Sequence, residues 1–109
     1  SLRRETMSFV GLETVDQLRI YNIDQAFMAA TGVSLQKGMT NASAYEYSIK
    51  KEVLERSGVK NLMVDHSKFG KTALYTFGDF QDFDCLVTDT CPPEDYIEVL
   101  SKNHVKLLY

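Results

Sequence analysis

Most of the information about the fold lies in the stretch Leu62-Met63-Val64-Asp65-His66-Ser67-Lys68-Phe69-Gly70. Its first three residues form a short apolar run bounded by polar residues, which is typical of a buried strand in a parallel sheet. In open parallel sheets, ligands bind in the crevice beyond the carboxyl ends of the strands. Each polar residue alone would suit a cap, a turn or a solvated surface. The cluster of Asp65, Ser67 and Lys68 favours a binding site in that crevice.

Upstream of this stretch, the pattern predicts the end of a strand at 8–11, a short helix over 13–19 and an apolar strand over 26–30. The polar passage 31–41 is expected to be a long loop. Asn41 or Ser43 is a suitable N-cap for a helix that continues to about Ser57, with Gly58 as its C-terminal stop.

Downstream, strands are expected at 73–77 and 85–88. The run Pro92-Pro93-Glu94-Asp95 is typical of a helix start, because proline suits the first turn and acids suit the positive end of the helix dipole. Asn103 is expected to end this helix before a final strand over 105–109. Alternating strands and helices predict βαβ units, a largely parallel sheet and right-handed crossovers.

Length and composition indicate one intracellular domain, which we expect to be cytoplasmic. The chain has 109 residues, of which 44% are hydrophobic and 25% charged, as in ordinary globular domains. No apolar run approaches the roughly 20 residues of a membrane span, and the N-terminus lacks the apolar segment of a signal peptide. The net charge is −3 and the basic residues are scattered, which argues against DNA binding by this segment.

The cysteines indicate neither a metal site nor a disulfide. Cys85 and Cys91 are the only two, and a zinc site would need two further ligands that are not found nearby. Cys85 lies in a strand-like run, so we expect it to be a small buried residue. A cytosolic setting disfavours a disulfide between the two.

The passage 31–41 also has features of an anion-binding loop. It ends at an expected helix N-terminus, where free N–H groups and the helix dipole favour negative charge. Gly38 would allow close approach of a phosphate, and Thr40 and Ser43 would supply hydroxyl groups. Its spacing matches neither a phosphate-loop signature nor a dinucleotide fingerprint.

Three further polar residues complete the inventory. Asp24 stands just before its expected strand, and Glu46 and Lys50 are four residues apart, hence on one helix face. The simpler interpretation of Glu46 and Lys50 is a surface ion pair that contributes at most about 0.5 kcal/mol. The functional interpretation is that these side chains belong to a binding site.

Five motifs in a shared order resemble the effector-sensing domain of DeoR-type bacterial transcriptional repressors, over nearly the whole chain from about Phe9 onward. They are Asp24–Val33, Gly38-Met39-Thr40, Glu46 with Ile49-Lys50, Asp65–Gly70 and Val87-Thr88-Asp89. The most specific is the Asp-x-Ser-Lys-Phe-Gly run. The departures are mild: Gln25 replaces a frequent lysine, Ala29 a frequent glycine and His66 a frequent serine.

This resemblance implies a Rossmann-like, three-layer α/β domain with a mainly parallel sheet, incomplete at its N-terminus. The fold would be similar to those of ribose-5-phosphate isomerase and glucosamine-6-phosphate deaminase. The resemblance also implies a homo-oligomeric sensor of a phosphorylated sugar, which regulates an N-terminal winged helix-turn-helix that binds DNA and is not in this chain. The expected effector-binding residues are Asp24, Gly38, Thr40, Glu46, Lys50, Asp65, Ser67 and Lys68. No catalytic residue, cofactor or metal is expected.

Two alternatives stay open at this point. A small sugar-phosphate isomerase or deaminase-like enzyme would need a carboxylate base, and Asp24 or Glu46 could serve. A blander possibility is that the domain mainly mediates oligomerisation. Lys68 is the first candidate for the phosphate, whereas Asp65 is as well suited to orient the loop as to contact a ligand.

Overall fold

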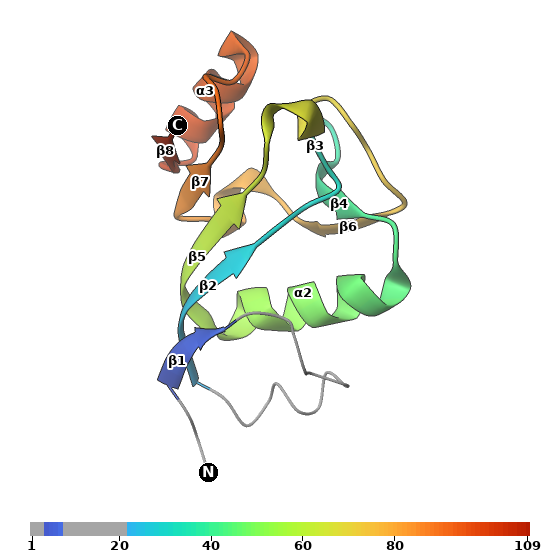
Figure 1. Cartoon of the computed structure of the whole chain (residues 1–109), viewed down its shortest axis with the longest axis vertical. Helices are drawn as coiled ribbons and strands as arrows, with labels where there is room; N and C mark the ends of the chain where they lie inside the picture. The colour runs from blue at the N-terminus through green and yellow to red at the C-terminus, as the bar shows by residue number, and fades with distance from the viewer. Residues whose placement is uncertain (1–3, 8–21) are drawn as a thin grey trace.

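A five-stranded parallel sheet forms the centre of the computed structural model, which describes residues 4–7 and 22–109 (Figure 1). Its strands stand in the order β1 (Arg4–Met7), β2 (Asn22–Met28), β5 (Ser57–Met63), β7 (Cys85–Val87) and β8 (Lys106–Leu108). All four pairings are parallel. The α/β class with a mainly parallel sheet is therefore confirmed. The strand expected at 8–11 and the helix expected over 13–19 lie outside the described residues.

The passage 31–41 is not the long loop expected from its polarity. It contains β3 (Gly32–Ser34) and β4 (Gly38–Asn41), which form an antiparallel sheet with β6 (Tyr75–Gly78). Val33 and Met39 are paired across this hairpin and both are almost fully buried. Gly38 closes the turn with a φ of +74°, a conformation that glycine adopts without steric cost.

Helix α2 (Ala44–Arg56) packs against β6, β2 and β5 and largely matches the expected helix (Figure 1). The Ser43 side chain accepts a hydrogen bond from the Glu46 N–H, which confirms Ser43 as the N-cap. The expected stop at Gly58 is wrong. The helix ends at Arg56, and Ser57 begins β5 while its hydroxyl donates to the Val53 carbonyl, 2.6 Å away. That side-chain bond satisfies a terminal carbonyl without a glycine.

The C-terminal unit follows the sequence prediction closely. Helix α3 (Glu94–Lys102) begins after Pro93 and is followed by Asn103, and β8 completes the sheet. Two short 3₁₀ turns, η1 (His66–Lys68) and η2 (Phe80–Asp82), connect other elements. Cys85 is half-buried rather than buried, because the face of β7 that carries it is only partly covered. Cys85 and Cys91 are both free thiols.

One face of the parallel sheet is buried under the described helices, whereas the other face is partly exposed. Met28, Leu62 and Leu86 are neighbours in the register and lie fully buried in one core with residues of α2 and α3. The opposite face carries large apolar side chains that are 40–47% exposed: Phe27, Val59, Met63 and Leu108. Neither described helix is long and apolar enough to cross a membrane.

Candidate binding site at the carboxyl edge of the sheet

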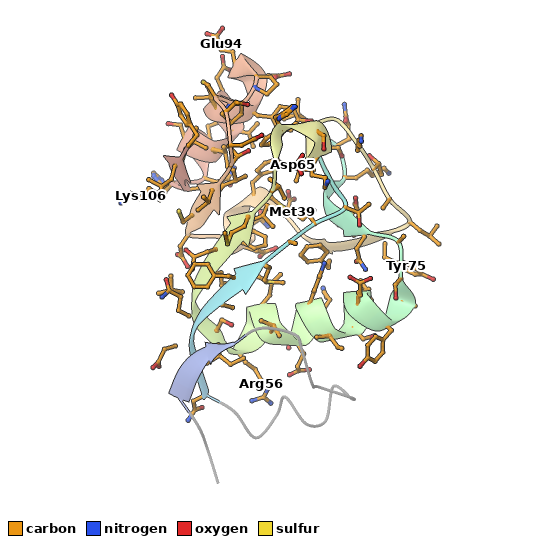
Figure 2. All side chains as sticks on the ribbon, viewed as in Figure 1. Met39, Arg56, Asp65, Tyr75, Glu94 and Lys106 are labelled. Atoms are coloured by element: carbon orange, nitrogen blue, oxygen red, sulfur yellow. The ribbon has the colours of Figure 1, made fainter. Side chains whose placement is uncertain are left out.

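The residues that follow β5 and β7 meet at one edge of the sheet. Met63 and Val87 are partners in the register, and the Val64 N–H donates to the Val87 carbonyl at 3.0 Å. Figure 2 shows Asp65 just beyond β5, at the opposite end of that strand from Arg56. An open depression of about 340 Å³ lies here, lined by Met63, Val64, Asp65, Val87, Thr88 and Asp89. The depression lies at the strand ends where the sequence predicts a ligand crevice, and ligand binding there stays a prediction.

Asp65 organises the turn η1 that carries the other polar groups. Its carboxylate accepts hydrogen bonds from the Ser67 N–H at 2.8 Å, from the Ser67 hydroxyl and from the Lys68 ammonium at 3.3 Å. These bonds, that of the Ser67 hydroxyl first, lower the pKa of Asp65 to about 2. The carboxylate is therefore ionised at neutral pH, and its hydrogen bonds to Ser67 and Lys68 stabilise the turn. The Lys68 side chain is 32% exposed, and because its ammonium also donates to the Ser67 hydroxyl at 3.4 Å, one of its three N–H groups is left for another partner.

His66 and Asp89 form a second pair at this edge. Asp89 accepts from the His66 backbone N–H through Oδ1 and contacts His66 Nδ1 through Oδ2, both at 2.7 Å. The hydrogen bond with Asp89 raises the pKa of His66, and the same contact lowers the pKa of Asp89. Both residues belong to the quoted motifs, but neither is among the expected binding residues. The sequence does contain a pattern that could have pointed to this pair: an aspartate follows each of two strands that end in apolar residues.

The turn is fixed to the rest of the fold by its last residues. The Gly70 N–H donates to the Val33 carbonyl at 2.8 Å, and the Tyr96 hydroxyl donates to the same carbonyl at 3.2 Å. The rings of Phe69 and Tyr96 pack edge to face with centroids 5.1 Å apart. Contacts to β3 and α3 thus hold η1 in place, so its polar side chains project from a supported turn.

Lys50 is not the solvated partner of a surface ion pair, as the simpler interpretation had it. Only 6% of it is exposed, and its ammonium donates to the Ala29 carbonyl at 2.8 Å. The ammonium also lies 3.7 Å from the Glu46 carboxylate and 5.0 Å from the centre of the Phe77 ring. Burial lowers the pKa of Lys50. Because Ala29 directly follows β2, this buried cation stands under the same edge of the sheet.

The remaining expected residues lie elsewhere. Thr40 is fully buried, and its hydroxyl donates to the Gly32 carbonyl at 3.2 Å and accepts from the Ala73 N–H at 2.8 Å. Gly38 is buried in the hairpin turn, where an added Cβ would stand 2.5 Å from the Gly78 carbonyl oxygen. Asp24 lies within β2 rather than before it. At about 3.3 Å per residue, it is roughly 13 Å from the end of that strand.

A second cavity is less suited to an anion. It measures about 300 Å³ and is lined by Lys51, Leu54, Glu55, Lys60, Phe77 and Asp82. Two carboxylates oppose its two ammonium groups, and Lys60 lies in the middle of β5 rather than at its end. Among the described residues, no group of three or more histidine, cysteine, aspartate or glutamate side chains could hold a metal ion.

Comparison with known proteins gives a consistent picture. The family model described as the DeoR C terminal sensor domain matches residues 1–90. The HTH-type transcriptional regulator IolR of Bacillus subtilis is 40% identical over 103 residues, which cover 94% of this chain and 41% of that protein. The deoxyribose operon repressor of Escherichia coli is 37% identical over 86 residues, covering 79% of this chain and 34% of the repressor. The chain thus spans less than half the length of these curated relatives.

Proposed function

The chain belongs to the DeoR C-terminal sensor domain family, and from this premise we propose that it is the effector-sensing part of a cytoplasmic transcriptional repressor. The effector that we propose is a phosphorylated sugar, bound where β5 and β7 end. The observation that carries this proposal is the Lys68 ammonium, which stands partly exposed on a supported turn beside an open depression. Charge-assisted hydrogen bonds from such a group are the usual means of holding a phosphate.

The expected residues take different parts in this proposal. Lys68 contacts the phosphate, and the exposed carboxylate of Glu46 is available to sugar hydroxyl groups near the end of β2. Asp65 and Ser67 orient the turn, and Lys50 is held under the edge by Ala29 and Glu46. Gly38 and Thr40 support the hairpin, and Asp24 lies too far along β2 to reach the same ligand.

We propose that the domain is not an enzyme. Isomerisation of a sugar phosphate needs a base that accepts a proton from carbon, and a carboxylate with a depressed pKa is a poor acceptor. The two carboxylates that line the depression are Asp65, with a pKa of about 2, and Asp89, whose pKa is also lowered. The Glu46 carboxylate lies outside this lining and is paired with the Lys50 ammonium at 3.7 Å. The relatives are named as transcriptional regulators, which favours the same conclusion.

Partners beyond the effector also follow as proposals. DNA would be bound only by another part of a longer protein, because the twelve basic residues here are scattered among fifteen acidic ones. Self-association is favoured by the exposed apolar sheet face, since such faces commonly mark protein contacts. Sedimentation equilibrium of the chain should then give a mass above 12.4 kDa.

Thermal shift of the full-length protein with phosphorylated hexoses and pentoses tests the main proposal. A ligand at 100 times its dissociation constant should stabilise the protein by about 2.7 kcal/mol. The same sugars without phosphate are the control and should give no shift. The proposal is wrong if no phosphorylated sugar shifts the transition. Recovery of an isomerised or deaminated product from the same samples, absent in Glu46→Gln, would favour the enzyme instead.

A further inference from the structure

Two ion pairs lie at the carboxyl edge, His66 with Asp89 and Lys68 with Asp65. The His66 side chain is the most exposed of the four, at 68% against 32% for Lys68. We propose that His66, held by Asp89, is a second cationic contact of the effector site and accepts an anionic ligand only when its ring is protonated. This inference rests on the proposed function of the same edge. It adds His66 as a contact of the ligand and makes binding depend on protonation of its ring.

The hydrogen bonds to Asp89 decide which ring nitrogen can reach a ligand. One oxygen of the carboxylate accepts a hydrogen bond from the His66 backbone N–H, and the other is hydrogen-bonded to Nδ1, so two hydrogen bonds fix the position of His66. A carboxylate with a depressed pKa only accepts hydrogen bonds, and Nδ1 must therefore carry a proton. No hydrogen-bond partner for Nε2 is found among the residues that the structure describes. This nitrogen is the one that remains for a ligand.

Protonation reverses the character of Nε2. In the neutral ring Nδ1 keeps the proton, and Nε2 presents a lone pair that repels the oxygen of an anion. In the cationic ring Nε2 carries a proton and donates a charge-assisted hydrogen bond. The charged groups that face the ring are Asp89, which follows β7, and Asp65 of the same turn. Both favour the cation, and the hydrogen bond with Asp89 is the main reason why the pKa of His66 is raised.

A second cation has a clear use at this site. The ammonium of Lys68 lies 3.3 Å from the Asp65 carboxylate, which offsets part of its charge. A phosphate monoester carries up to two negative charges, and one partly neutralised lysine is a weak counterpart. Protonated His66 stands two residues from Lys68, and its charge balances that of Asp89, so the four charged groups of this edge carry no net negative charge that would repel an anion. The pair would thus prefer a dianion to a neutral sugar.

Sulfate is a suitable probe, because it keeps its double charge over the pH range in which a phosphate ester itself titrates. The chain has only two histidines, so the imidazole proton signals of His66 and His104 are easily assigned by NMR. We expect sulfate to bind about five-fold more tightly near pH 6 than near pH 8, the scale of a partly exposed ion pair. The His66→Gln variant should show no such difference.

Two variants make the test specific. His104→Asn removes the other histidine, which lies between α3 and the amino end of β8, whereas His66 follows the carboxyl end of β5, and should leave the pH dependence intact. Asp89→Asn should lower the midpoint of the His66 titration and shift the pH dependence of sulfate binding by the same amount. If His66 had only a structural role, Asp89→Asn would change the midpoint of the His66 titration without an equal shift in the pH dependence of sulfate binding.

The failures of the two proposals can be told apart. If phosphorylated sugars shift the melting transition but the pH dependence of sulfate binding is equal in wild type and His66→Gln, the inference about His66 is wrong and the sensor function stands. If neither sulfate nor any phosphorylated sugar binds at either pH, both proposals fall together.

Discussion

Polar residues of two regions look alike in the sequence and differ in what surrounds them. At the carboxyl edge, the side chains of Asp65, His66 and Lys68 are 32–68% exposed and keep groups that no described residue uses. In the hairpin and helix α2, Thr40 and Lys50 are at most 6% exposed and bind backbone carbonyls. A buried polar group stabilises the fold through its partners, whereas an exposed one is available to a ligand. Substitutions should therefore affect stability in one region and binding in the other.

The largest loss of stability is expected for Gly38→Ala. Its φ of +74° is strained for alanine, and the added Cβ would stand 2.5 Å from the Gly78 carbonyl oxygen. We expect a loss of about 3 kcal/mol in the free energy of unfolding, measured in urea. Gly70→Ala is the matched control, because Gly70 also has a positive φ but open space around its Cβ position. Equal losses for the two variants would show that the contact with Gly78 is unimportant.

The next largest effect is expected at Lys50. Lys50→Ala removes a buried stem and leaves the Ala29 carbonyl without its donor, which should cost about 2 kcal/mol. Lys50→Met keeps the apolar stem and should lose about half as much. The exposed neighbour Lys51→Ala should change the free energy of unfolding by less than about 0.5 kcal/mol. A similarly small change for Lys50→Ala would mean that its ammonium is solvated.

Thr40→Val should have a smaller effect on stability. Valine keeps the shape but leaves the Ala73 N–H and the Gly32 carbonyl without the hydroxyl, at a cost of about 1.5 kcal/mol. Thr76 pairs with Thr40 across β4 and β6 but is exposed, so Thr76→Val is the control and should be nearly neutral. Thermal unfolding of both variants decides the matter. No difference between them would contradict a structural role for the Thr40 hydroxyl.

Lys68→Ala should have the smallest effect on stability and a large effect on binding. Its ion pair with Asp65 is partly exposed, so the free energy of unfolding should change by less than about 0.5 kcal/mol. The stabilisation of the full-length protein by a phosphorylated sugar should disappear. Lys71→Ala, an exposed lysine three residues further on, should retain that stabilisation. An undiminished response in Lys68→Ala would remove the main support for the site.

Local signals account for the parts that the sequence predicted well. The N-cap Ser43 and the prolines before α3 act within one turn of the helix that they start, so the helices were placed nearly correctly. The hairpin β3–β4 was missed because its strands are three and four residues long, too short for an apolar period. Its pairing with β6 depends on residues more than thirty positions away.

The positions of the candidate site residues in the fold divide in the same way. Asp65, Ser67 and Lys68 follow one strand, and the rule for parallel strand ends finds them without further information. The pair of His66 and Asp89 requires the knowledge that β5 and β7 are neighbours, which is a tertiary fact. The burial of Lys50 depends in the same way on where Phe77 packs. Spacing along a helix gave its pairing with Glu46 but not its environment.

The mixture of local and distant strand pairing has a consequence for folding kinetics. The hairpin joins Val33 to Met39, close in sequence, whereas the parallel sheet joins Met28 to Leu62. Closing long loops is slow, so the hairpin can form early and the sheet must assemble late. The contact between Asp89 and His66 spans β5 and β7 and exists only after that assembly. A ligand that uses His66 would therefore recognise only chains that have completed folding, and would slow their unfolding as a whole.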